Sequence, residues 1–233
     1  MMHHTTSAIP VAVIVDYGMG NLFSVHAACT RAGLHVTVTA DPVVIRRANI
    51  LLLPGVGAFG DAMNVLHRHG LDDEIRTAAA AGTPIVGICL GMQLLATESE
   101  EFGCHAGLGI IPGRVIHLGA PRAANGIPLK VPHVGWNEIA RPAHQSGDPW
   151  AGTLLDGLPD GAEFSFVHSF RVVPSDPAAV LAETQYGDVI FASVVRSGNV
   201  YGFQFHPERS GAVGAQVYAH IAAVMSEAYA FHH

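Results

Sequence analysis

The sequence predicts an α/β protein with a mostly parallel central sheet, and three observations support this fold class. Short apolar runs alternate with helix-like segments through the first half of the chain, which is the order of repeated βαβ units. The first run, residues 11–15, is a β-branched stretch of the kind that is covered on both faces of a parallel sheet. Glycine-containing turns, such as residues 18–20 and 82–83, separate the strands from the helices.

The elements of this half can be placed in order. After the strand at residues 11–15, Asn21 is expected to cap a helix over residues 22–32, and Gly33 ends that helix. Strands are then expected over residues 35–40, 49–53 and 84–86. Helices are expected over residues 61–68 and 73–81, with a short one over residues 92–97.

The pattern changes after about residue 102, where short strands separated by turns replace the alternation with helices. This half predicts an antiparallel or mixed sheet added to the same domain, followed by a last helix over residues 212–229. The stretches at 120–126 and 141–152 are expected to be exposed loops. The strands are expected over residues 108–118, 162–172, 180–183, 189–195 and 201–205.

Length and composition indicate one domain over residues 1–233, with a folded core over about residues 10–231. A chain of 233 residues, 49% of them hydrophobic, buries one sizeable core and is short for two. A net charge of −7 with only 12 Lys and Arg argues against a nucleic-acid partner. No apolar run is long enough to cross a membrane, and residues 1–10 lack the features of a secretory signal.

The cysteines and histidines indicate a reducing compartment and no metal or other cofactor. Three cysteines are an odd number for a disulfide framework, so a cytoplasmic location is expected. Of the 15 histidines, His3-His4 and His232-His233 lie at the termini. The sequence contains no Cys-x-x-Cys or His-Glu-x-x-His spacing, so we expect no metal site.

Cys89 is the first candidate for a catalytic residue. It lies in Gly-Ile-Cys-Leu-Gly at residues 87–91, between an apolar run and a helix-like stretch. A side chain on such a tight strand-to-helix turn needs small residues two positions away on either side, and Gly87 and Gly91 meet that need. The amides of the following helix would favour the reactive thiolate. The alternative is a buried structural cysteine.

His206 and Glu208 are the candidates for a base and for the group that orients it. The alternating residues 201–205 are strand-like and carry His206 to a strand end, where open α/β sheets place their sites. Pro207 makes the chain leave the sheet there, so Glu208 can turn back to the imidazole. A histidine after a strand is more often an ordinary polar residue, and it is the combination with Cys89 that favours catalysis.

Acyl chemistry at Cys89 also needs amide donors for a developing oxyanion. The amide of Leu90 is one candidate because it follows the nucleophile. The loop Pro-Gly-Val-Gly at residues 54–57 follows another parallel strand, and its glycines permit close backbone approach. An ordinary glycine-rich turn is the alternative for this loop.

Two motifs, Gly-Ile-Cys-Leu-Gly-Met-Gln at residues 87–93 and Phe-His-Pro-Glu at residues 205–208, resemble the class I (triad) glutamine amidotransferases over nearly the whole chain. The resemblance implies a flavodoxin-like three-layer fold. It also implies that a cysteine, histidine and glutamate hydrolyse glutamine, and that further residues bind the substrate or the oxyanion. Those roles fall on Cys89, His206, Glu208, Gly55, Val56, Gly57, Leu90 and Gln93. Gln93 could instead be an exposed helical residue.

Finer motifs resemble one subfamily, the glutaminase subunits of imidazole glycerol phosphate synthase. They are residues 16–22, 54–57, 132–137, 166–169 and 206–211. The resemblance implies a heterodimer with a (β/α)8-barrel cyclase subunit that receives the ammonia in histidine biosynthesis. It also implies that the loop around Val56 rearranges before the oxyanion hole is complete. Asn21, Trp136 and Arg209 are expected near that partner, although Arg209 stands where many relatives have lysine.

Two other functions stay open at the level of sequence. The glutaminase of pyridoxal phosphate synthase also supplies a barrel partner, but the loop at residues 54–57 and the motif at residues 132–137 argue against it. A catalytically silent regulatory subunit is a different class of function, and retention of Cys89, His206 and Glu208 argues against that. Cys29 and Cys104 have no expected role.

Overall fold

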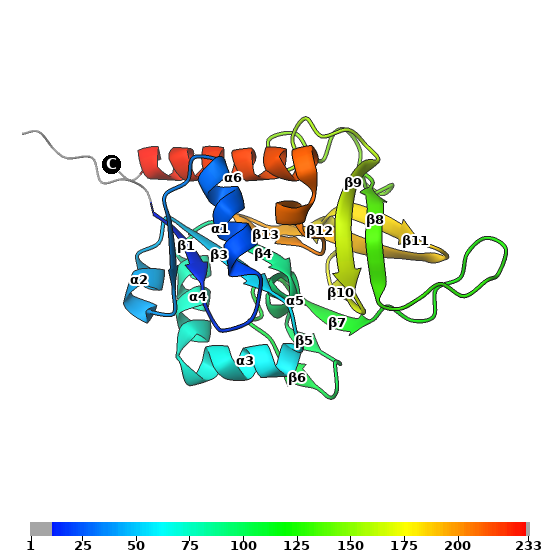
Figure 1. Ribbon diagram of the computed structural model, residues 1–233, viewed down its shortest axis with the longest axis horizontal. Helices are drawn as coiled ribbons and strands as arrows, with labels where there is room; N and C mark the ends of the chain where they lie inside the picture. Colours follow the sequence, from blue (N-terminus) through cyan, green and yellow to red (C-terminus); the bar gives the residue numbers. More distant parts are fainter. Residues whose placement is uncertain (1–10, 232–233) are drawn as a thin grey trace, which may run out of the picture.

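The computed structural model describes residues 11–231, with the backbone alone described for residues 225–231. The two terminal histidine pairs lie outside the described residues. A seven-stranded sheet in the order β11-β12-β13-β4-β3-β1-β2 forms the centre of the molecule (Figure 1). Its strands from β13 to β2 are parallel, and β12 and β11 extend it with antiparallel pairing. The predicted α/β class, mostly parallel with added antiparallel strands, is confirmed.

The parallel strands are apolar because both of their faces are covered. In β1, Ile14 packs into the core on one face of the sheet and Val13 into the core on the other, and both are fully buried. The seven strands are β1 (Ala12–Val15), β2 (Val36–Thr39), β3 (Ile50–Gly55), β4 (Ile85–Cys89), β11 (Val180–Tyr186), β12 (Val189–Ser197) and β13 (Val200–Phe203).

Helices cover both faces of the sheet and complete a three-layer arrangement. On one face α1 (Leu22–Arg31) and α6 (Gly211–Phe231) lie together (Figure 1). The other face carries α2 (Pro42–Arg46), α3 (Phe59–Arg68) and α4 (Leu71–Ala80). The expected cap of α1 is present, because the side chain of Asn21 accepts a hydrogen bond from the backbone N–H of Ser24 at 3.2 Å.

The second half adds two smaller sheets beside the central one. A four-stranded sheet has the order β10-β7-β5-β6, and a two-stranded ribbon pairs β8 with β9. These strands are β5 (Glu98–Ser99), β6 (His105–Ala106), β7 (Gly113–His117), β8 (His133–Ile139), β9 (Ala162–His168) and β10 (Phe170–Pro174). Two 3-10 turns, η1 (Pro177–Ala179) and η2 (Pro207–Arg209), connect later elements.

Three expected elements differ most from the observed ones. The strand expected over residues 162–172 is two strands, because the chain changes its pairing partner at Ser169: β9 pairs with β8, and β10 pairs with β7. Of the strand expected over 108–118, only β7 forms. The residues before it bond to the end of α5 (Leu90–Leu94), with the N–H groups of Ile110 and Ile111 donating to Leu95. The helix expected over 92–97 is α5, which begins directly after Cys89.

The composition of residues 141–152 predicts an exposed loop, but part of this stretch is buried. Trp150 is fully buried, and its indole N–H donates to the carbonyl of Leu181 at 2.8 Å. The guanidinium of Arg141 lies over the Trp150 ring at 4.1 Å from its centroid. Part of this segment is therefore anchored in the core by one aromatic side chain.

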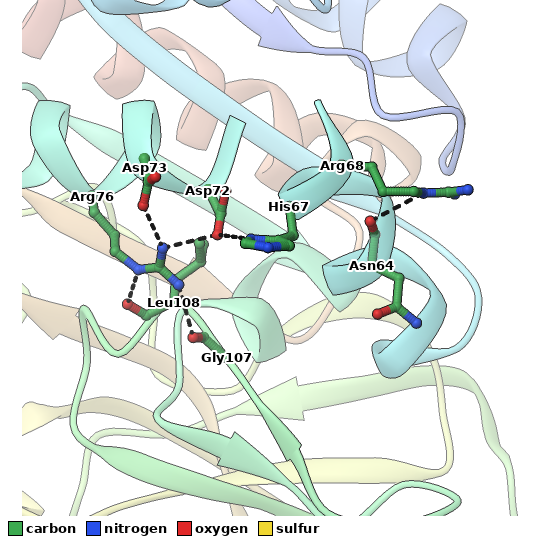
Figure 2. Close-up of polar contacts among 8 residues, drawn as sticks. All are labelled: Asn64, His67, Arg68, Asp72, Asp73, Arg76, Gly107 and Leu108. Atoms are coloured by element: carbon green, nitrogen blue, oxygen red, sulfur yellow. Dashed lines mark hydrogen bonds and ion pairs between the residues drawn. The ribbon is translucent and has the colours of Figure 1, made fainter. Parts of the chain in front are cut away.

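An ionic cluster around the buried side chain of Asp72 ties α4 to the segment before β7 (Figure 2). The carboxylate of Asp72, only 6% exposed, accepts hydrogen bonds from Arg76 at 3.0 Å and from His67 at 3.2 Å. Arg76 also donates to the carbonyls of Gly107 and Leu108. Burial raises the pKa of Asp72, but the bonds from His67 and Arg76 outweigh burial and hold it below the ordinary value.

None of the described helices has both the length and the apolar character that a membrane span requires.

Candidate active site

Cys89 lies at the end of β4, on the turn into α5, with φ 54° and ψ −109°. An L-residue adopts this region only under strain, as expected for a nucleophile on such a turn. The glycines on either side are required by space. A Cβ atom at Gly87 would lie 2.6 Å from the carbonyl oxygen of Gly91, and one at Gly91 would lie 1.6 Å from that of Leu53.

A pocket of about 330 Å³ opens over Cys89. It is formed where three parts of the chain meet: the loop after β3, the turn from β4 into α5, and the corner between β9 and β10. Predicted site residues Val56, Gly57, Cys89, Leu90 and Gln93 all line it. The volume is in the range of small-molecule sites.

His206 follows β13 and pairs with Glu208 as predicted. Its Nδ1 lies 2.8 Å from Oε1 of Glu208, and the side chains are only 5% and 2% exposed. Pro207 opens the 3-10 turn η2, and this turn brings Glu208 back to the ring. A carboxylate can only accept, so Nδ1 carries the proton that is shared with Glu208.

The charge around His206 favours its protonated form. Burial lowers its pKa, but the sulfur of Cys89 and the carboxylate of Glu208 outweigh burial and raise the pKa to about 10. The other ring nitrogen, Nε2, is buried and has no hydrogen-bond partner among the described residues. This arrangement leaves Nε2 available for proton exchange at the sulfur.

A second histidine, His168, also lines the pocket but is a poor candidate for the base. Its Nδ1–H donates to the carbonyl of Phe170 at 2.9 Å, and its Nε2 accepts from Nδ1 of His133 at 3.1 Å. Burial, together with the neighbouring histidines, lowers its pKa to about 3. Both of its nitrogens are occupied, and the ring stays neutral.

Two glutamines support the sulfur. Gln93 is buried, and its amide donates to the carbonyl of Phe170 at 3.1 Å and to the side-chain oxygen of Gln204 at 3.3 Å. The amide of Gln204 in turn lies 3.9 Å from the Cys89 sulfur. The alternative of an exposed Gln93 is therefore wrong. Gln204 was not predicted, although a polar residue within the apolar run 200–205 is a signal that could have indicated it.

The expected oxyanion loop lies beside Cys89. Gly55, the last residue of β3, is in register with Cys89 of β4. A Cβ atom at Gly55 would lie 2.1 Å from the hydroxyl of Tyr17, and that hydroxyl donates to the carbonyl of Pro54 at 2.6 Å. Beyond this braced position, Gly57 has φ 129°, and the side chain of Val56 is 46% exposed. The loop is thus fixed at Gly55 and reaches the surface at Val56.

Glu101 is a pocket residue that the sequence did not indicate. Its side chain is mostly buried, and Oε2 accepts a hydrogen bond from the backbone N–H of Phe59 at 2.7 Å. It lines the pocket next to Phe102, which is 87% exposed at the rim. Glu101 lies in no sequence motif, and its carboxylate reaches the pocket only because the fold places the β5–β6 turn there.

The three residues expected near a partner lie outside this pocket. Asn21 is the cap of α1, Arg209 is exposed in η2, and Trp136 is 57% exposed on β8. Their interface role stays a prediction. Within residues 11–224, whose side chains the structure describes, no three histidine, cysteine, aspartate or glutamate side chains lie close enough together to hold a metal ion.

The fold and the geometry define a class of protein: a three-layer α/β protein with a cysteine on a strained strand-to-helix turn and a buried histidine–glutamate pair behind it. The sequence model of the class-I glutamine amidotransferase family matches residues 13–221. The chain belongs to this family of enzymes.

Its relatives identify the group within the family. The chain is 49% identical to imidazole glycerol phosphate synthase subunit HisH of Geobacillus thermodenitrificans over 205 residues, which cover 88% of this chain and 91% of that protein. It is 47% identical to HisH of Syntrophotalea carbinolica, with 88% and 96% covered. The chain therefore belongs to the HisH group. The solved structure of PurLQS from Thermotoga maritima, 23% identical with 93% and 99% covered, has the same fold with a TM-score of 0.67.

Proposed function

We propose that this chain hydrolyses glutamine to glutamate and ammonia through Cys89, His206 and Glu208. The observation that carries the proposal is the free Nε2 of His206, which is buried beside a cysteine that faces a pocket. The thiolate attacks the side-chain amide carbon of glutamine, and the backbone N–H of Leu90 and the loop at residues 55–57 hold the oxyanion. His206 gives its proton to the leaving nitrogen, so ammonia departs and a glutamyl thioester remains.

Water completes the cycle. It attacks the thioester carbon while His206 takes a proton from it, and the carbon–sulfur bond breaks to release glutamate and the thiolate. Glu208 keeps the imidazole in one tautomer through both steps. Glu101 is the carboxylate of the pocket, and we assign it to the α-ammonium of glutamine because it supplies the opposite charge there.

We further propose that the ammonia passes to a cyclase subunit, a (β/α)8 barrel. That subunit would form imidazole glycerol phosphate and an aminoimidazole carboxamide ribotide in histidine biosynthesis. The names of the HisH relatives support the partner. The surface beside the pocket supports it too, since the outward face of the β8–β9 ribbon exposes Val134, Trp136 and Val167. An apolar surface at the mouth of a site is typical of a protein interface.

The proposal includes a gate at Val56. A lone subunit with a complete oxyanion hole would waste glutamine, and one missing donor typically costs roughly 100- to 1000-fold in rate. Val56 is exposed on the loop that follows the braced position of Gly55, so a partner can reach it. We expect slow hydrolysis by the isolated chain and an acceleration of that size when the cyclase and its ribonucleotide substrate are bound.

The test is glutamate release by the chain alone, with cyclase, and with cyclase plus ribonucleotide. The matched control is the Cys89→Ala complex, which should bind cyclase and use added ammonia but release no glutamate. Equal rates in the three mixtures would contradict the gate. Absence of release in every mixture, with cyclase still bound, would indicate the silent regulatory subunit instead.

A further inference from the structure

A second cavity lies against the Glu208 end of the candidate triad. It has a volume of about 280 Å³ and lies between α1 and α6, which are neighbours on one face of the sheet (Figure 1). Ala28 and Arg31 of α1, Tyr218 of α6 and Glu208 of η2 line it. The carboxylate of Glu208 thus lies between His206, which is on the side of the Cys89 pocket, and this second cavity.

Two polar atoms at this cavity are buried and have no hydrogen-bond partner among the described residues. They are Oε2 of Glu208 and the hydroxyl oxygen of Tyr218. The Glu208 side chain is 2% exposed, and Tyr218 is 1% exposed. Buried polar groups are nearly always paired, and leaving a charged one unpaired is costly. The two groups are complementary, because a hydroxyl donates and a carboxylate oxygen accepts.

The surroundings of Glu208 keep the hydroxyl of Tyr218 protonated, so this hydroxyl can donate a hydrogen bond. Burial raises the pKa of Tyr218 well above its ordinary value, and the negative charge of Glu208 raises it further, so the hydroxyl keeps its proton. Cys29 on α1 also faces Glu208, and its pKa is raised to about 12, chiefly by burial, so it stays neutral. Arg31 is the cation at the cavity wall, and His206 lies on the other side of the carboxylate.

We propose that Tyr218 is a positioning residue of this site, which holds Glu208 by donating a hydrogen bond to its Oε2 through a water molecule in the cavity. The inference rests on the proposed function, since it assigns Tyr218 a part in activating Cys89. A cavity of this size with a hydroxyl, a carboxylate and a guanidinium on its wall suits bound water. With Oε2 held, Oε1 keeps its bond to Nδ1 of His206, and the histidine keeps its place beside the sulfur.

The test is Tyr218→Phe, which removes the hydroxyl and keeps the ring. The readout is the pH dependence of the alkylation of Cys89 by iodoacetamide, followed by peptide mass spectrometry. The exposed Cys104 serves as an internal standard in the same molecule. We expect the Cys89 rate at neutral pH to fall roughly 3- to 10-fold, the effect of one hydrogen bond. The acid limb should move to higher pH, because the ionised carboxylate loses a donor. The Cys104 rate should not change.

Two further variants separate positioning from a structural role. Tyr201→Phe removes the hydroxyl of another buried tyrosine, on β13 and outside this cavity, and should leave the Cys89 profile unchanged. Tyr218→Phe in a Glu208→Gln background should have no further effect, because the two act in one chain of contacts. In the complex with cyclase, Tyr218→Phe should lower kcat for glutamine hydrolysis and leave KM unchanged.

The possible failures can be told apart. A Tyr218→Phe profile that superposes on the wild type, while the wild type hydrolyses glutamine, overturns the role of Tyr218 alone. An undiminished effect of Tyr218→Phe in the Glu208→Gln background also overturns it. A wild-type Cys89 that reacts no faster than Cys104, with no glutamate released alongside cyclase, overturns the proposed function itself.

Discussion

Two buried carboxylates in this molecule, Asp72 and Glu208, have similar surroundings and different tasks. Each pairs one oxygen with a basic side chain, Arg76 at 3.0 Å and His206 at 2.8 Å respectively. Each leaves its other oxygen buried without a hydrogen-bond partner among the described residues. Asp72 also accepts from His67, so both carboxylates have a histidine neighbour (Figure 2). Burial, charge and histidine contact do not distinguish the two sites.

The partner of each carboxylate does distinguish them. Arg76 donates its other hydrogen bonds to the carboxylate of Asp73 and to the carbonyls of Gly107 and Leu108, so the Asp72 cluster holds α4 to the segment before β7. An arginine also keeps its charge at any ordinary pH. His206 can give up and take back a proton, and its Nε2 is buried beside Cys89 without a hydrogen-bond partner among the described residues. A free proton-transfer group next to a strained nucleophile indicates chemistry, whereas a saturated cation indicates structure.

The largest expected effect is the loss of the nucleophile. Cys89→Ala should reduce glutamate release in the presence of cyclase by roughly 10,000-fold or more, because the covalent step is lost. Arg76→Met, the matching change in the structural cluster, should leave the rate within about twofold of the wild type and lower the melting temperature. Residual glutamate release by Cys89→Ala at a comparable rate would show that another group is the nucleophile.

A crossed pair of isosteric changes gives the next largest effect. Glu208→Gln should lower the rate by roughly 10- to 1000-fold, less than His206→Ala, because the base remains but is poorly oriented. Asp72→Asn should instead cost about 1 to 3 kcal/mol of unfolding free energy, measured by urea denaturation, and leave the rate unchanged. Loss of activity in both variants, or of stability in both, would contradict a catalytic role for Glu208 and a structural role for Asp72.

The pH dependence of stability gives the smallest effect, with opposite signs at the two sites. The pKa of His206 is raised from 6.5 to about 10, so its protonation stabilises the fold fully below pH 6.5, and the contribution is lost as the pH rises through about 10. The pKa of Asp72 is lowered from 3.8, so its contribution is present above that value and is lost as the pH falls below it.

Thermal unfolding of the wild type, His206→Gln and Asp72→Asn across this pH range measures both contributions. The difference between the wild type and His206→Gln should shrink toward alkaline pH. The difference between the wild type and Asp72→Asn should shrink toward acid pH. A difference that stays constant with pH would mean that the group is not charged in the way its surroundings indicate.

The sequence predicted the parallel half of the fold because its signals are local. Runs such as residues 11–15 alternate with helices, and glycines mark the turns. It failed where tertiary pairing decides, since nothing within residues 162–172 marks the change of partner at Ser169. The short helix α2 was missed because only five residues form it, after the cap at Asp41.

The candidate site divides in the same way. Cys89, His206 and Glu208 lie in short motifs, and the spacing of those motifs fixes their local geometry. Glu101 and Gln204 reach the site through long-range packing, from a turn and from a strand that carry no motif. Sequence therefore indicates the candidate reactive groups, and the fold is needed to find the groups that surround them.

The one-residue corner at Ser169 also determines where this fold tolerates a change in chain length. β9 and β10 belong to different sheets, so an extra residue between them would reverse the side chains of β10 or shift its register with β7. The carbonyl of Phe170, which holds Gln93, would move with it. A peptide tag placed in an exposed segment such as 124–127 should therefore be accepted, whereas an insertion at the corner should disturb the site.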